Sequence, residues 1–336
     1  MCALFLAAGC GTTRVEPLGD GSATSRPKCT DTASLLVDYI DQLPDSASGH
    51  IQMPEIAVNA TDLFYFFTTP SGDARVGRLM RIPLRGGTPA PLALVPGLLS
   101  TSLQALVATP TGVIYAEGPY GDAGAGKILA VPSHRGEAGT VAPTAGRANG
   151  LVSDGENLYF FDREATKAVP LAGGEVRVLT EKLGAPGVVG NTLVLANGDG
   201  TISSVPTQGG PLKLLASGPW QPLAPIDCGG SACWLVIGVS GQLMRVGLEG
   251  GTPEVLIEGL SGMTHVVFDG KNFFVTLGGG GLGIYRIPAE GNEATAIVTG
   301  TGISGLALDD ECLYWSSFEG IFSLALRAAA VAGPAQ

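Results

Sequence analysis

The sequence predicts an all-β fold built from repeated four-stranded sheets, and two observations lead to it. Hydrophobic residues make up 45% and charged residues 15% of the 336-residue chain, which also contains 51 Gly and 23 Pro. This balance is typical of many short strands joined by tight turns. In addition, a phrase of an aliphatic residue, Pro, two spacers and Gly-Gly recurs about every 40 residues, the period of a propeller blade. Together these observations predict a β-propeller.

The recurring phrase suits a tight hairpin near the end of each repeat, because glycine adopts positive φ at little cost. A single repeat cannot bury its apolar face without neighbours, so we expect the repeats to form one closed domain. The six copies, three of them imperfect, are Ile82–Gly87, Val131–Gly136, Val169–Gly174, Val205–Gly210, Val246–Gly251 and Ile287–Asn292.

Upstream of each phrase, a short apolar strand turns at Asp or Asn into an aromatic-rich or aliphatic second strand. Leu151–Ser153, for example, turns at Asp154-Gly155, a pair that favours a hairpin. The phrase lies on a third strand, and a fourth follows it, so each repeat is predicted to be one antiparallel four-stranded blade. Seven second strands predict seven blades: Leu63–Phe66, Val113–Tyr115, Leu158–Phe161, Leu193–Leu195, Cys233–Val236, Phe273–Val275 and Leu313–Trp315.

The seventh repeat ends at Gly320–Leu326 without a fourth strand. Ser34–Ile40 lies ahead of the first complete repeat and has a strand-like composition. We expect this N-terminal segment to add as the outer strand of the last blade, because an open ring would leave sheet edges exposed. A short helix over residues 32–43 is the alternative.

Four cysteines are predicted to form two disulfides if the chain folds in an oxidising compartment. Cys228 and Cys233 flank four residues, so a bond between them would pin the first hairpin of the fifth blade. Cys29 precedes the closing segment, and Cys312 begins the second strand of the seventh blade. These two strands would run parallel with both cysteines at one edge, which predicts a Cys29–Cys312 bond. A metal site is the weaker alternative, because no His lies at ligand spacing.

The first ten residues form an apolar run that ends in Gly9-Cys10. Leu6–Cys10 resembles the lipobox of bacterial lipoproteins, although Ala7 replaces the usual Leu and the basic n-region is missing. The resemblance implies lipid attachment at Cys10 and a place in the bacterial cell envelope, at the outer membrane or its periplasmic face. We expect residues 1–9 to be a signal segment whose start lies further upstream. An ordinary cleaved secretory signal is the alternative.

The rest of the chain divides by composition. Residues 10–30 are rich in Gly, Ser, Thr and Pro, which predicts a flexible tether. The propeller is expected over residues 31–327, and the small residues of 328–336 predict a disordered tail.

The aromatic pair in the second strand also carries a family resemblance. Tyr314-Trp315-Ser316-Ser317 comes close to the YWTD tetrapeptide, and Phe64-Tyr65 and Tyr159-Phe160 are looser copies. Residues 31–327 therefore resemble YWTD-type and related bacterial propellers in the order of their motifs. Propellers of the YWTD type normally have six blades, whereas seven copies are counted here. The resemblance implies a fold and no particular substrate.

The charge and the scarcity of titratable residues limit the functions to be considered. A net charge of −11 argues against nucleic acid as a partner, since phosphates require a basic surface. Of the residues directly before the seven predicted first strands, only Glu55 and His265 can titrate. They come from blades two positions apart and do not make a metal centre. We therefore predict no catalytic set, no metal and no cofactor.

Acidic residues in the loops between second and third strands are candidate calcium ligands, because calcium takes six to eight oxygen ligands. Their glycine-rich surroundings favour the plainer interpretation that they form turns. They are Asp73, Asp122, Asp162, Glu164 and Asp199.

The longest loops between second and third strands, Thr68–Gly77 and Glu117–Gly126, belong to adjacent blades. Because function concentrates on loops carried by rigid scaffolds, they mark the predicted binding face. We predict a lipid-anchored, monomeric, non-enzymatic module that binds an envelope protein, peptide or glycan. The alternative is a metal-dependent propeller hydrolase or lactonase of the gluconolactonase-like kind. The candidate binding-face residues are Glu55, Asp73, Arg75, Tyr120, Asp122 and His265.

Overall fold

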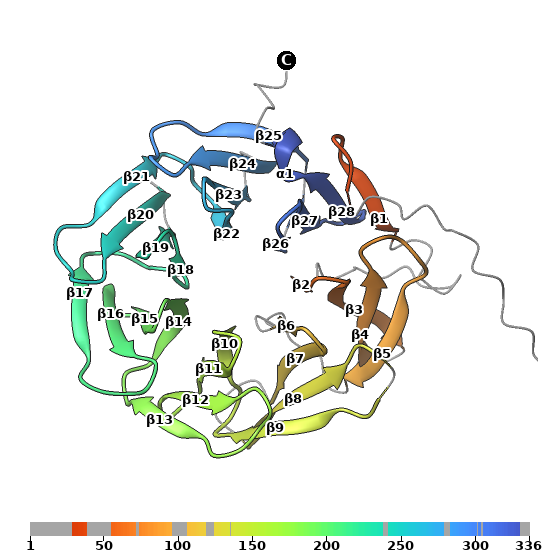
Figure 1. The fold of residues 1–336 in the computed structure, drawn as a ribbon, viewed down its shortest axis with the longest axis horizontal. Helices are drawn as coiled ribbons and strands as arrows, with labels where there is room; N and C mark the ends of the chain where they lie inside the picture. Colours follow the sequence, from red (N-terminus) through yellow and green to blue (C-terminus); the bar gives the residue numbers. More distant parts are fainter. Residues whose placement is uncertain are drawn as a thin grey trace, which may run out of the picture.

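The fold is a ring of seven antiparallel four-stranded sheets around a central axis, seen face-on in Figure 1. The all-β, seven-bladed prediction is confirmed. The structure is a computed structural model, and α1 (Leu326–Ala329) is the only helix in its described part. It describes residues 29–38, 55–71, 74–95, 106–118, 124–134, 136–237, 241–278, 283–300, 302–303 and 305–329.

In blades 1 to 6 the strands follow chain order from the axis to the rim. Blade 1 contains β2 (Ile56–Val58), β3 (Asp62–Ser71), β4 (Ala74–Pro83) and β5 (Ala90–Val95). Blade 2 contains β6 (Leu106–Thr109), β7 (Gly112–Glu117), β8 (Gly126–Pro132) and β9 (Gly139–Thr144). Blade 3 contains β10 (Asn149–Ser153), β11 (Asn157–Phe161), β12 (Thr166–Pro170) and β13 (Arg177–Thr180).

The remaining blades continue around the ring in the same way. Blade 4 contains β14 (Gly184–Val189), β15 (Thr192–Asn197), β16 (Thr201–Pro206) and β17 (Lys213–Ser217). Blade 5 contains β18 (Ile226–Asp227), β19 (Ser231–Val236), β20 (Gln242–Gly247) and β21 (Glu254–Glu258). Blade 6 contains β22 (Met263–Phe268), β23 (Asn272–Leu277), β24 (Gly283–Pro288) and β25 (Thr295–Thr299). Blade 7 contains β26 (Leu306–Leu308), β27 (Cys312–Ser316), β28 (Gly320–Ala325) and β1 (Ser34–Asp38).

Blade 7 is completed by the N-terminal strand β1, which confirms the predicted closure. β1 pairs with β28 in antiparallel register, with Val37 opposite Ile321. The Oγ atoms of Ser34 and Ser323 are 3.0 Å apart, and Val37 is buried with 2% of its surface exposed. The described part of the segment is therefore a strand, and the helix considered for residues 32–43 does not form there.

Two disulfides are present, and the longer one joins the ends of the ring. Cys29, which lies just before β1, is bonded to Cys312, the first residue of β27, across 283 residues of sequence. Cys228 and Cys233 bridge the β18–β19 hairpin of blade 5. Because disulfides persist in oxidising compartments, the pair indicates an extracytoplasmic protein.

The core lies between neighbouring blades, where the aromatic second strands pack. One cluster joins Tyr65 and Met80 of blade 1 to Tyr314 and Ile321 of blade 7, and Val37 of the closing strand belongs to it. Both tyrosines are fully buried. The large rings fill the gap between adjacent sheets, which explains why each repeat favours an aromatic or bulky second strand.

The recurring Gly-Gly phrase has two structural roles. It closes a turn, in which the backbone N–H of Gly173 donates to the carbonyl of Pro170 at 2.8 Å. It also docks the hairpin on the outer strand of the preceding blade: the N–H of Gly251 donates to Leu215 O at 3.1 Å, and that of Asn292 to Leu256 O at 2.8 Å. A Cβ on Gly291 would lie 2.2 Å from Leu256 O, so glycine is required at this contact.

The ends of the chain lie largely outside the described residues. The predicted signal segment 1–9, with Cys10, and most of the predicted tether fall there. Of the predicted tail, Ala328 and Ala329 form the end of α1, and the rest is not described. No helix in the described ranges is long and apolar enough to span a bilayer.

Candidate binding site at the ring axis

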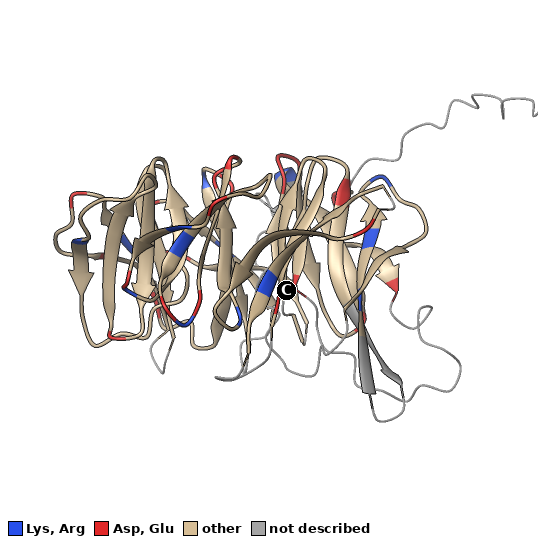
Figure 2. Ribbon diagram, turned by 90° about the horizontal axis from the view of Figure 1, so that it is seen from below, with Lys and Arg blue, Asp and Glu red and all other residues tan. Residues whose placement is uncertain are grey.

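One face of the ring carries Glu55 and His265, two of the predicted binding residues. We call it the entry face: it is the face at which innermost strands begin, and it carries Glu55, Leu183, Ile237 and Phe318. Because the strands of a blade are antiparallel, the hairpins between second and third strands lie on this same face. Figure 2 shows the ring edge-on, with charged residues concentrated on loops and the outer surface.

The structure shortens one of the two predicted loops. Residues 68–77 were expected as a loop, but β3 and β4 pair out to Ser71 and Ala74. Arg75 lies within β4, where its backbone is opposite Pro70. Asp73, Tyr120 and Asp122 lie outside the described residues.

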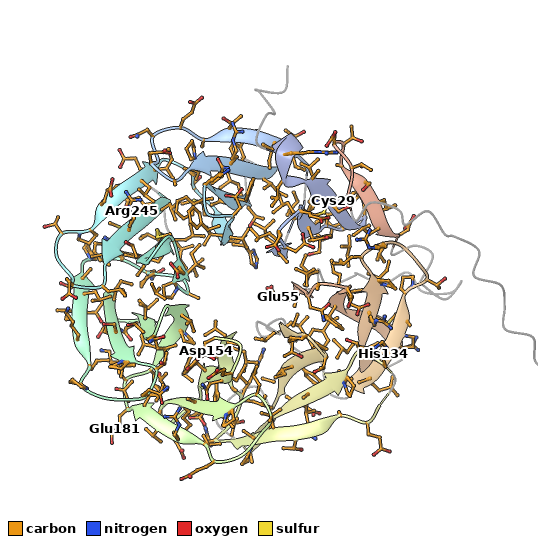
Figure 3. The ribbon with its side chains drawn as sticks, viewed as in Figure 1. Cys29, Glu55, His134, Asp154, Glu181 and Arg245 are labelled. Carbon is orange, nitrogen blue, oxygen red and sulfur yellow. A yellow bond between two sulfur atoms is a disulfide. The ribbon has the colours of Figure 1, made fainter. Side chains whose placement is uncertain are left out.

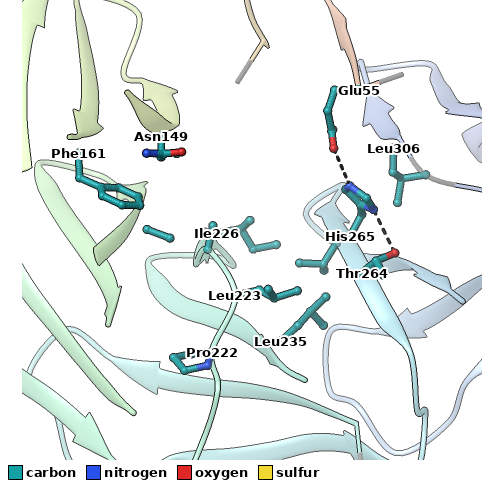
Figure 4. A pocket seen from close by; sticks show the side chains of 14 residues that line it. Glu55, Asn149, Phe161, Pro222, Leu223, Ile226, Leu235, Thr264, His265 and Leu306 are labelled. Carbon is teal, nitrogen blue, oxygen red and sulfur yellow. Dashed lines mark hydrogen bonds and ion pairs between the residues drawn. The ribbon is translucent and has the colours of Figure 1, made fainter. Parts of the chain in front are cut away.

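A cavity of about 360 Å³ occupies the ring axis near the entry face. Its walls come from the starts of innermost strands and adjoining residues of six blades, and most of them are apolar, including Phe161, Leu223, Ile226 and Leu306. Figure 4 shows these side chains around the opening. The volume lies at the lower end of the range for small-molecule and side-chain sites, roughly 300–1,000 Å³.

The polar edge of the cavity is a contact between Glu55 of blade 1 and His265 of blade 6. His265 Nε2 lies 3.2 Å from Glu55 Oε1, and both side chains are about three-tenths exposed. His265 Nδ1 is 3.1 Å from Thr264 Oγ1 and 3.3 Å from Thr276 Oγ1. In the neutral imidazole these contacts suit one tautomer, in which Nε2–H donates to the carboxylate and Nδ1 accepts from a threonine hydroxyl. His265 therefore holds Glu55 in place.

The structure brings together the two titratable residues that the sequence placed two blades apart. Glu55 projects toward the centre of the ring in Figure 3. His265 is the third residue of β22 and does not precede the strand as predicted. The difference arises because β22 begins at Met263, three residues before the predicted start at Val266, and its pairing with β23 shifts register between Met263 and His265.

Asn149 faces the pair from blade 3 and was not predicted. Its Nδ2 donates to Arg147 O at 3.1 Å, and its Oδ1 points into the cavity beside Phe161 (Figure 4). The sequence predicts that this strand begins at Leu151, which makes Gly150 the residue directly before it and hence the candidate for the axis. β10 actually begins at Asn149. Starting the predicted strand at Asn149 instead of Leu151 would have identified this residue.

The three acidic loop residues in the described ranges are each paired with a lysine, whereas Asp73 and Asp122 lie outside those ranges. Asp162 is buried and accepts hydrogen bonds from Lys167 Nζ at 2.7 Å and from the backbone N–H of Ala145 at 3.0 Å. Glu164 pairs with the same lysine, and Asp199 pairs with Lys182. Within the described ranges, no three His, Cys, Asp or Glu side chains come together as metal ligands would.

Asp162 is expected to make the free energy of unfolding fall at acid pH. Burial raises the pKa of its carboxyl, but the hydrogen bonds from Lys167, Ala145 and Glu164 outweigh burial and leave the pKa below its ordinary value. A pKa lowered in the folded state gives stability that is complete above the unfolded pKa, about 4, and is lost as pH falls through the folded value. Urea unfolding between pH 6 and pH 2, roughly spanning that range, should show a shallower acid loss in Asp162→Asn than in the wild type.

Glu164→Gln is the matched control, since Glu164 contacts the same lysine but is 68% exposed. Its acid profile should follow that of the wild type. An Asp162→Asn profile parallel to the wild type would contradict this assignment.

Comparison with known proteins identifies the architecture. No family model matches the chain, and no curated protein matches its sequence. Solved structures do match. Virginiamycin B lyase from Staphylococcus aureus has 12% identity and a TM-score of 0.60, covering 87% of this chain and 97% of the lyase. The chain is a β-propeller.

Two further propellers align over most of their lengths. YCF48, solved bound to a D1 peptide, has 11% identity and a TM-score of 0.59, covering 88% of this chain and 94% of that chain. BamB from Moraxella catarrhalis has 17% identity and a TM-score of 0.52, covering 80% and 83%. Identities this low establish the shared fold alone.

Proposed function

We propose that this propeller is a monomeric, non-enzymatic module that binds a polypeptide at the centre of its entry face. The observation that carries the proposal is the cavity of about 360 Å³ at the ring axis, walled by residues of six blades. A closed ring fixes these walls relative to one another, so the site is preformed. A propeller solved with a bound peptide, YCF48, supports the same use of the fold.

Exposed apolar side chains on the entry face favour a protein partner over a glycan. Leu183, Ile237 and Phe318 are 41%, 39% and 54% exposed. Leu183 precedes β14, whereas Ile237 follows β19 and Phe318 lies between β27 and β28, so all three occupy the entry face. Protein interfaces characteristically combine exposed apolar and aromatic residues with a polar rim, here supplied by Glu164, Lys182 and Asp199.

Photocrosslinking tests this face directly. A photoreactive phenylalanine analogue placed at Phe318 or Ile237 should give discrete adducts with a polypeptide in the producing cell. The same analogue at Glu156, an exposed residue in the β10–β11 turn on the opposite face, is the control and should give none. Equal adducts from both faces, or none from the entry face, would contradict the proposal.

We also propose that Cys10 anchors the module to the envelope membrane through lipid, at the outer membrane or its periplasmic face. Gly9-Cys10 at the end of an apolar run supports this, as do the two disulfides. In a precursor extended upstream, metabolic labelling with a fatty acid should be lost in Cys10→Ser. Cys2→Ser, which changes the other N-terminal cysteine, should keep the label. Equal labelling of Cys10→Ser and wild type would refute the anchor.

A further inference from the structure

We infer that the axial cavity receives a basic side chain, Lys or Arg, which the bound polypeptide projects along the ring axis. The cation would lie at Glu55, and its hydrocarbon stem would lie against the apolar wall. This inference rests on the proposed function, because it assigns the chemistry of the bound segment.

The charge of the lining is the first argument. Among the described residues that line the cavity, Glu55 is the only carboxylate, and none is Lys or Arg. Its Oε1 accepts from His265 Nε2, and no residue in the described ranges donates to Oε2. One oxygen of a held carboxylate therefore remains available to a ligand.

The pattern of donors and acceptors is the second argument. The hydroxyls of Thr264 and Thr276 are 2.8 Å apart and both contact His265, so they are engaged with one another and with the imidazole. Asn149 uses its Nδ2 on Arg147 O and turns Oδ1 to the cavity (Figure 4). The polar side-chain atoms left to a ligand are thus acceptors, facing one another across the axis. A ligand rich in donors and positively charged complements them best.

The apolar wall is the third argument. Lys and Arg bury their methylene stems on apolar surface while the charged head seeks polar partners. Leu223 and Ile226 offer such a surface below the Glu55–His265 pair in Figure 4, and Leu306 lies beside the pair. The net charge of −11 also favours the approach of a basic partner.

Blocked amino acids test the inference without knowledge of the partner. The probes are the N-acetyl, N-methylamide derivatives of lysine, arginine and norleucine, where norleucine keeps a linear hydrocarbon stem but has no charge. The chain contains 3 His, so selective ¹⁵N-histidine labelling gives few signals, and His265 reports on the cavity. The ¹⁵N chemical shift of His265 is followed as each probe is added. The two basic derivatives should reach half of the full shift at about tenfold lower concentration than norleucine, because a hydrogen bond to a charged group adds that much affinity.

Glu55→Gln should remove this difference between the probes. Glu156→Gln, which changes the net charge equally on the opposite face, should preserve it. Equal binding of norleucine, unchanged selectivity in Glu55→Gln, or no His265 shift with any probe would each overturn the inference. If Glu55→Gln fails to fold, as checked by thermal unfolding, the lysine and norleucine titrations of the wild type decide by themselves.

Failure here is distinguishable from failure of the proposed function. Crosslinking from Phe318 or Ile237 does not depend on the charge of the inserted side chain. Entry-face adducts without probe selectivity would leave the binding module standing and remove only the basic side chain.

Discussion

Replacing Cys29 and Cys312 together by serine is expected to lower the midpoint of thermal unfolding by about 10 °C, at roughly 2 °C per kcal/mol for a domain of this size. The bond spans 283 residues, and loop-entropy models assign on the order of 5 kcal/mol to a closure of that length. Without it, β1 is held to blade 7 by its pairing with β28 and by side-chain packing. The measurement is calorimetry of the wild type and the double variant.

The second disulfide provides the matched control. Cys228 and Cys233 are only 5 residues apart, so the same models assign their bond about 2 kcal/mol, and the corresponding double serine variant should lose about 4 °C. Deleting residues 29–42 should be more damaging than either change, since it bares the edge of β28 and promotes aggregation. If the two double variants lose the same amount, ring closure by Cys29–Cys312 is not a major source of stability.

The second large effect is expected from Gly187→Ala in β14. A Cβ at this position would lie 1.8 Å from Pro225 O, a backbone atom of the next blade. The inner strands converge on the axis and cannot separate locally, so the clash must be relieved by displacing blade 5. We expect a cost of about 3 kcal/mol and a fall of about 6 °C in the unfolding midpoint.

Gly198→Ala is the control for this substitution. Its Cβ would meet nothing within 4 Å, and its φ is not in the left-handed region. Its midpoint should stay within about 1 °C of the wild type, as for a neutral surface change. A Gly187→Ala midpoint equally close to the wild type would show that the inner strands yield more readily than the close contact implies.

The sequence was most informative where a local pattern has one structural solution. The Gly-Gly phrase predicted the blades because it turns the chain, and in several copies it also approaches the preceding outer strand closely, as Gly291 does at Leu256. The missing fourth strand of the last repeat predicted closure, because the edge of β28 needs a partner. Both predictions depend only on contacts within one blade or between adjacent blades.

The axial site could be predicted only in part. Glu55 and His265 were identified by their type and position, but their contact depends on the ring diameter, which no local pattern encodes. Asn149 was missed because β10 starts two residues earlier than predicted, and His265 was misplaced because β22 starts three residues earlier. Such shifts of one or two residues leave a blade intact and still change which side chain faces the axis.

The position of the Cys29–Cys312 bond also has a mechanical consequence. In a chain anchored through Cys10, any pull from the membrane would enter the ring at Cys29. Without the bond, that force would peel β1 from β28 one hydrogen bond at a time, starting at Ser34. The disulfide instead passes the load to β27, a strand held on both sides within its blade. The tension therefore bypasses the strand that closes the ring, and the propeller can be tethered without being opened.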